Sequence, residues 1–157
     1  MKYARLTEEQ FTEFEEEFIN FLSTQSITAE EWCTMKEENP NLAEDELDVF
    51  SDLIWEGVLS NVNYLESISP QSMHLFSCDE KEMHLISVKI LNPDVDLGTE
   101  VGFAWFRKNW QSDFVEYLTA AKAYSTDKNI DKFELIQKGA VITKGALFQW
   151  FDDVIEE

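Results

Sequence analysis

The stretch that decides the fold class is residues 72–90, SMHLFSCDEKEMHLISVKI. Apolar and polar residues alternate on both sides of the polar tetrapeptide at 79–82. Alternation with a period of two is typical of strands, and the polar residues between them suit a turn, so the pattern predicts a β-hairpin. Residues 62–68, which precede Pro70, extend the pattern. The sequence therefore predicts either a hairpin or a three-stranded antiparallel meander.

Helical patterns lie on both sides of this β region. Thr7 and Gln10 have the spacing of a capping box, and Thr28 and Glu31 repeat it. Further apolar periodicity predicts helices over 43–60, after Thr99, after Ser112, over 129–138 and after Thr143. The prediction is an α+β fold: a single compact, mostly helical domain over 1–157. Within it we expect an acidic helical part at about 1–61, the β region at about 62–91 and a helical C-terminal part at about 99–157.

The composition predicts a folded and strongly acidic chain. With 157 residues, of which 44% are hydrophobic and 13% aromatic, the chain can bury a core of its own. Its 32 acidic and 12 basic residues give a formal net charge of −20. Residues 1–66 carry 17 acidic and 3 basic residues, a net −14, and residues 67–157 carry 15 and 9, a net −6. Such a charge disfavours direct binding to nucleic acids or anionic membranes and favours a basic protein partner.

Two groups of residues are candidates for binding that partner. In the first predicted helix, phenylalanines recur at helical spacing and leave Glu13, Glu16 and Glu17 toward solvent. In the segment WFRKNW at 105–110, aromatic and cationic residues are interleaved, which gives the second group, Trp105, Arg107 and Trp110. The alternative for the second group is a purely structural role, in which the aromatic residues belong to the core and the cations between them are solvated.

No catalytic, metal or cofactor site is predicted. If the turn pairs Cys78 with Met83, then His74 lies opposite Ser87 and His84 opposite Ser77, which places the two rings on opposite faces of the sheet. Only a bulge or a loop of odd length would bring them together. The segments DVDLG at 94–98 and GAVITKG at 139–145 lack the residue order of calcium and phosphate loops.

The cysteines and the first residues predict a cytoplasmic location. Cys33 and Cys78 are too few for a disulfide scaffold, which suits two reduced, packed thiols. The opening MKYAR leads directly into a helical pattern, and no run of about 20 apolar residues follows.

Several stretches carry a resemblance to a known family: MKYARLT at 1–7, ELDVFSDLIWEGVL at 46–59, YLE before ISP at 64–70, and GAVITKG at 139–145. They resemble a family of small uncharacterised proteins of Bacteroidota over nearly the whole chain. The resemblance implies a bacterial cytoplasmic protein. It brings no activity and no functional residues with it.

Three functions follow as hypotheses. The first is a non-enzymatic interaction or adaptor protein that binds a basic protein partner through its acidic helical face. The second is a carboxylate-based, metal-assisted hydrolase, and the third is a nucleic-acid-mimicking inhibitor of a DNA- or RNA-binding protein. An apolar patch exposed beside the acidic face would favour the first, and a pocket lined by two or more carboxylates the second.

Overall fold

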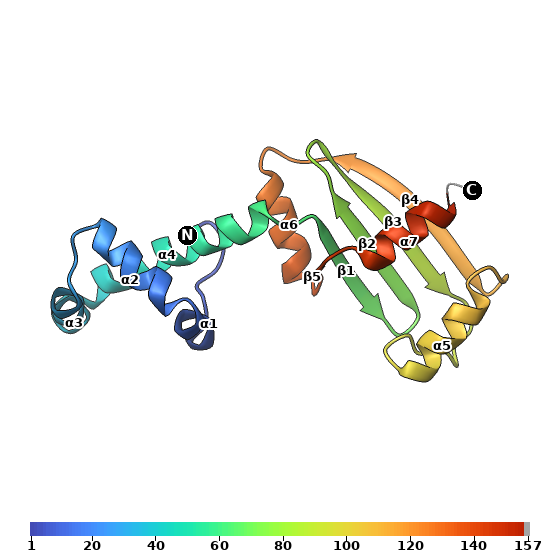
Figure 1. Ribbon diagram of the computed structural model, residues 1–157, viewed down its shortest axis with the longest axis horizontal. Helices are drawn as coiled ribbons and strands as arrows, with labels where there is room; N and C mark the ends of the chain where they lie inside the picture. Colours follow the sequence, from blue (N-terminus) through green and yellow to red (C-terminus); the bar gives the residue numbers. More distant parts are fainter. Residues whose placement is uncertain (156–157) are drawn as a thin grey trace. The chain divides into compact units, whose positions relative to one another are not determined.

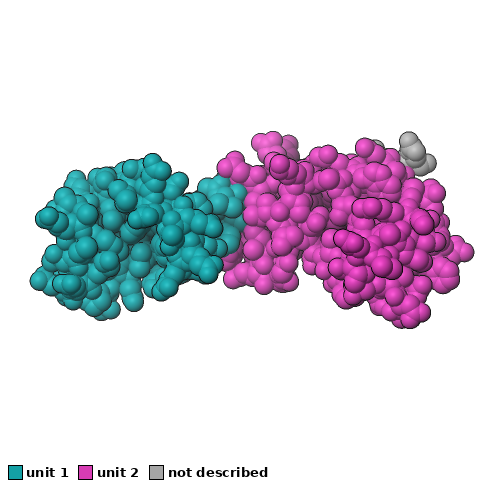
Figure 2. All heavy atoms as spheres, turned by 60° about the horizontal axis from the view of Figure 1, so that its bottom comes forward, with its two compact units in different colours: residues 1–60 teal, residues 61–157 magenta. Residues whose placement is uncertain are grey.

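The chain divides after Ser60 into two units in the computed structural model, which describes residues 1–155. Unit 1 is Met1–Ser60 and unit 2 is Asn61–Glu157 (Figure 2). The division lies one residue before the predicted end of the acidic helical part. Helices and an antiparallel sheet together make an α+β fold, as predicted (Figure 1).

The regular elements of unit 1 are all helices. Its helices are α1 (Glu8–Glu13), α2 (Glu15–Thr24), α3 (Ala29–Glu38) and α4 (Pro40–Ser60). The predicted helix starts are confirmed: Thr7 and Gln10 form a complete capping box, and the Thr28 hydroxyl accepts from the Glu31 backbone N–H at 3.1 Å. The helix predicted from residue 43 begins at Pro40, because proline suits the first helical position.

Aromatic rings form the centre of unit 1. Phe50 of α4 is 2% exposed, and the rings of Phe11, Phe18 and Phe21 lie with their centroids 5.0–6.1 Å from its own. The first predicted helix is divided at Phe14, whose φ of −102° and ψ of 23° leave the helical region. The phenylalanine periodicity therefore predicted the buried side correctly but not the break in the helix.

Unit 2 is built on a five-stranded antiparallel sheet in the order β4-β3-β2-β1-β5. The strands are β1 (Tyr64–Ser69), β2 (Ser72–Cys78), β3 (Glu82–Ile90), β4 (Val115–Ala123) and β5 (Val141–Thr143). The predicted hairpin is confirmed in its register, because Cys78 pairs with Met83. β1 supplies the third strand of the predicted meander.

The prediction of a wholly helical C-terminal part is wrong. Residues 115–123 form β4 where a helix was predicted after Ser112, and residues 141–143 form β5. β4 contains the helix-favouring run Ala120, Ala121 and Lys122, and its side chains from Leu118 onward are exposed, so burial imposes no alternation on its sequence. Nine consecutive residue pairs with β3 override this local preference.

Helices cover both faces of the sheet in unit 2. On one face, α5 (Glu100–Asn109) and α7 (Ala146–Ile155) pack over a core that includes Met73, Ile86, Phe106 and Phe151. On the other face, α6 (Lys128–Gln137) packs over a smaller cluster around Leu65, Cys78 and Met83. Within residues 1–155, no helix has both the length and the apolar character that crossing a membrane requires.

Candidate partner-binding sites

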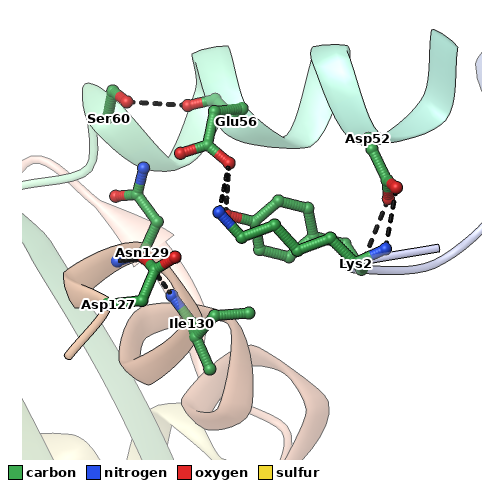
Figure 3. Close-up of polar contacts among 8 residues, drawn as sticks. Lys2, Asp52, Glu56, Ser60, Asp127, Asn129 and Ile130 are labelled. Atoms are coloured by element: carbon green, nitrogen blue, oxygen red, sulfur yellow. Dashed lines mark hydrogen bonds and ion pairs between the residues drawn. The ribbon is translucent and has the colours of Figure 1, made fainter. Parts of the chain in front are cut away.

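The segment before α1 is held along α4 by carboxylates (Figure 3). Asp52 accepts hydrogen bonds from the backbone N–H groups of Lys2 at 2.7 Å and Tyr3 at 2.9 Å. Glu56 accepts from the Tyr3 hydroxyl at 2.6 Å and lies 3.0 Å from the Lys2 ammonium. Burial raises the pKa of Tyr3 to about 12, and the hydrogen bond to Glu56 adds to this shift. These two acidic residues therefore have a structural role.

A second pair of contacts extends this attachment. The Arg5 guanidinium lies 2.7 Å from Asp48, and this hydrogen bond raises the pKa of Arg5. The buried Ser51 hydroxyl accepts from the Leu6 backbone N–H at 3.0 Å. Two of the three basic residues of unit 1, Lys2 and Arg5, are thus held by carboxylates of the same unit.

Most acidic residues of unit 1 are left facing solvent. Residues 1–60 contain 16 acidic and 3 basic residues, a net −13. Glu13 ends α1, and Glu16 and Glu17 lie in the first turn of α2; all three side chains are exposed. The remaining cation, Lys36, lies 5.8 Å from the centroid of the Trp32 ring. The three predicted glutamates are thus part of an acidic surface.

An apolar strip lies on α4 of the same unit. Leu42, Val49 and Leu53 are 49%, 52% and 55% exposed, and their spacing of seven and four residues places them on one side of the helix. We call these three residues the apolar strip. Leu53 faces solvent although it belongs to the apolar periodicity that predicts this helix. α4 has two apolar sides, and the aromatic cluster covers the one that carries Phe50.

Two residues of the second predicted group, Arg107 and Trp110, meet at a pocket in unit 2. They line a cavity of about 330 Å³ between α5 and α7, together with Phe103, Phe106, Leu147, Trp150 and Phe151. The Trp110 and Trp150 ring centroids are 4.9 Å apart, and the Arg107 guanidinium lies 5.1 Å from the Phe103 ring. Trp105 packs half-buried against the core and does not line the cavity.

The histidines lie apart, as predicted. His74 pairs with Ser87, whose hydroxyl is 3.2 Å from the ring, and His84 pairs with Ser77 on the opposite face. His84 Nε2 lies 3.0 Å from Asp79 and 3.3 Å from Glu82.

His84 also lines a second cavity, of about 400 Å³, with Asp79 and Asp152 in its wall. The Ser77 hydroxyl donates to Asp79 at 3.1 Å rather than to the imidazole, so the histidine does not activate it as a nucleophile. Among residues 1–155, no group of three His, Cys, Asp or Glu side chains is placed to hold a metal ion.

A buried lysine lies on the α6 side of the sheet. Lys132 is 1% exposed, and its ammonium donates to the Val62 carbonyl at 2.7 Å. Burial lowers its pKa, and burial raises the pKa of the nearby Cys78 thiol. Cys78 is packed as predicted, whereas Cys33 is exposed, contrary to the prediction.

Sequence reasoning missed the apolar strip and half of the aromatic pocket. The sequence does carry a signal for the strip. Leu42, Val49 and Leu53 are spaced seven and four residues apart, as residues on one side of a helix are, in addition to the buried residues of α4. Trp150 and Phe151 carry no comparable signal, because they lie about 40 residues beyond α5 and only the packing of α7 brings them to the pocket.

No curated protein and no solved structure matches the chain. A model of a family of unknown function matches residues 1–156, which confirms the resemblance to an uncharacterised family, while the bacterial lineage stays a prediction. The chain belongs to this family of unknown function, DUF6495.

Proposed function

We propose that this protein is a non-enzymatic interaction protein whose unit 1 binds a basic, amphipathic segment of another protein. The observation that carries the proposal is the apolar strip: Leu42, Val49 and Leu53 are each about half exposed on a helix of a unit with a net charge of −13. Apolar side chains that line up on one side of a helix offer a surface to a partner, whereas scattered ones do not.

The strip and the charges have separate tasks in this proposal. Burying the exposed halves of three large apolar side chains is worth about 3 kcal/mol in total, which is too little for a stable complex by itself. Exposed carboxylates of the same unit add attraction to lysine and arginine and speed the encounter. Because Lys2 and Arg5 are already held by Glu56 and Asp48, they do not neutralise the exposed glutamates.

The length of the strip indicates the form of the partner. Leu42 and Leu53 are eleven residues apart on α4, which is about 16 Å along the helix axis. A partner helix of three turns or more, with apolar residues at helical spacing and Lys or Arg beside them, fits such a surface.

A defined probe tests the proposal. A synthetic helix of about 18 residues (~27 Å long), with leucine on one side and lysine on the other, should bind the protein, and binding should weaken as salt is raised. A peptide with the same leucines and with glutamate in place of lysine is the matched control and should not bind. Isothermal calorimetry measures both, and equal binding of the two peptides would contradict the proposal.

Two variants separate the strip from the charges. Val49→Ser with Leu53→Ser should lower the affinity at any salt concentration, and Glu13→Gln with Glu16→Gln and Glu17→Gln should lower it mainly at low salt.

Proteins retained from the native cytosol by the wild type and lost by both variants are candidate partners, to be purified and measured in the same way. A nucleic-acid mimic would instead retain its partner when the strip is changed, because mimicry uses the carboxylates alone.

The cytoplasm is the compartment we infer for this interaction. The two cysteines are unpaired, and one of them is exposed, which suits a reducing environment.

One observation favours the hydrolase as a second candidate. The cavity of about 400 Å³ beside His84 has two carboxylates, Asp79 and Asp152, in its wall, as a carboxylate-based site requires. Mg²⁺ or Mn²⁺ should then raise the melting temperature of the wild type and not of Asp79→Asn with Asp152→Asn. If the metal raises neither melting temperature, the hydrolase is contradicted and the interaction proposal is unaffected.

A further inference from the structure

β4 is a long strand at the edge of the sheet in unit 2. It spans Val115–Ala123, pairs with β3 on one side through nine consecutive residues, and has no strand on the other side in the described part of the chain. Its side chains from Leu118 to Ala123 are all exposed. The strand contains no proline, its ladder with β3 is free of bulges, and Lys122 is its one basic residue, so it lacks most of the features that keep edges from pairing.

The sequence of β4 is complementary to itself in one antiparallel register. With a two-fold axis at Thr119, Glu116 lies opposite the partner's Lys122, and Leu118 lies opposite the partner's Ala120. All four residues lie on the same face of the sheet, because every second side chain of a strand points to the same face. Opposite charges that face each other across two strands stabilise the pair.

Two independent requirements select this register. Residues that lie directly opposite each other on two paired strands point to the same face of the sheet. A register with a two-fold axis perpendicular to the sheet is therefore centred on a residue, and the alternative registers are centred on neighbouring residues. The axis at Thr119 is the position at which the whole of Val115–Ala123 overlaps with its copy. Moving it to Leu118 or Ala120 shortens the overlap and places neither charged residue opposite an opposite charge.

Part of the face beside this edge is apolar. Leu118 is 62% exposed, and Ala120 pairs with Leu85 of β3 at the wall of a shallow cavity of about 230 Å³. Across the two-fold axis, Leu118 becomes the diagonal neighbour of the partner's Leu118, at a distance that large side chains bridge. Pairing therefore buries the most exposed apolar side chain of the strand.

We propose that β4 is a dimer interface, at which a second copy of this chain adds its own β4 in the antiparallel register centred on Thr119. The two sheets then form one continuous sheet. The interface lies in unit 2 and is independent of the partner-binding surface proposed for unit 1, so either proposal stands if the other fails.

Charge reversal tests the register. Sedimentation equilibrium of the full chain is measured at about 0.15 M salt, where a Debye length of about 8 Å limits the repulsion between acidic copies. Wild type should dimerise. Glu116→Lys and Lys122→Glu should each raise the dimer dissociation constant about tenfold or more, since symmetry makes two like-charge contacts. The double variant should return to within about threefold of the wild type, because the pairs are restored in reverse.

Cross-linking tests the position of the axis. In a Cys33→Ser background, Thr119→Cys should form a disulfide between two copies, because directly opposite Cα atoms lie about 4.5–5.5 Å apart. Ala121→Cys is the matched control, exposed on the same strand, and its two copies would be about 14 Å apart. A wild type that stays monomeric, a double charge variant that is not restored, or equal cross-linking at the two positions would each overturn the proposal.

Discussion

The two units use their charged residues differently. In unit 1, carboxylates of α4 hold the segment before α1, and the glutamates of α1 and α2 remain exposed without basic residues to balance them. In unit 2, residues 61–157 carry 16 acidic and 9 basic residues, and the features that stand out are apolar: an aromatic pocket and an open strand edge. A single net charge for the whole chain hides this difference, because a carboxylate that holds a backbone N–H serves the fold and an exposed one is free to serve a partner.

The largest expected effects come from removing the central aromatic residue of each unit. Phe50→Ala in unit 1 and Phe151→Ala in unit 2, residues that are 2% and 0% exposed, should each lower the free energy of unfolding by about 3–5 kcal/mol. Hydrogen exchange followed by mass spectrometry shows where the loss occurs. If the units are separately cooperative, Phe50→Ala raises exchange within 1–60 and Phe151→Ala within 61–157. A rise along the whole chain for both variants would instead show one cooperative unit.

A buried hydroxyl should matter next. Ser51 is fully buried in unit 1, accepts from the Leu6 N–H and donates to the Leu47 carbonyl. Ser51→Ala leaves that N–H unpaired, so we expect a loss of about 1–3 kcal/mol in urea unfolding. Ser23→Ala is the control, since that exposed hydroxyl donates to a carbonyl four residues earlier but holds no distant group. Equal losses for the two variants would mean that the contact with Leu6 contributes nothing.

The two kinds of acidic residue in unit 1 should then separate by stability. Asp52→Asn weakens the acceptor for two backbone N–H groups and should cost about 1 kcal/mol. Glu13→Gln, Glu16→Gln and Glu17→Gln together should cost at most about 0.5 kcal/mol, because all three side chains are exposed and only the weak interaction of Glu16 and Glu17 with the start of α2 is lost. Chemical unfolding measures both variants. A triple variant that is clearly less stable would assign these glutamates to the fold and remove the contrast.

The smallest expected effect concerns a carboxylate of unit 2. Burial raises the pKa of Glu66 above its ordinary 4.5, so the folded chain holds this proton more tightly than the unfolded chain does. Stability is then lost as pH rises above 4.5, and the loss is complete at neutral pH. Glu66→Gln should therefore melt at a higher temperature than the wild type at pH 7, and the gap should close toward pH 4. The exposed Glu134→Gln is the control, and an equal gap for it would rule out burial as the cause.

The elements that local physics specifies were predicted well. The capping box at Thr7, the N-cap at Thr28 and the hairpin register that pairs Cys78 with Met83 depend on residues a few positions apart, and the structure confirms these three features. The helix divided at Phe14 kept its predicted buried side, because the aromatic periodicity decides which side is buried.

The candidate sites were predicted less completely. Glu13, Glu16 and Glu17 are exposed, as expected of charged residues opposite an apolar side. Arg107 and Trp110 do share a pocket, but the residues that complete it come from α7, and nothing within 105–110 indicates them.

By itself, the sequence determined the acidity of unit 1, the start of its helices and the central hairpin, since each depends on composition or on short-range pattern. Only the tertiary structure decided that 115–123 is an edge strand, that Leu53 faces outward and that α5 and α7 enclose a pocket. The reason is physical: pairing with β3 and packing against Phe50 are contacts between distant residues, and their free energy outweighs local preferences of about 1 kcal/mol or less.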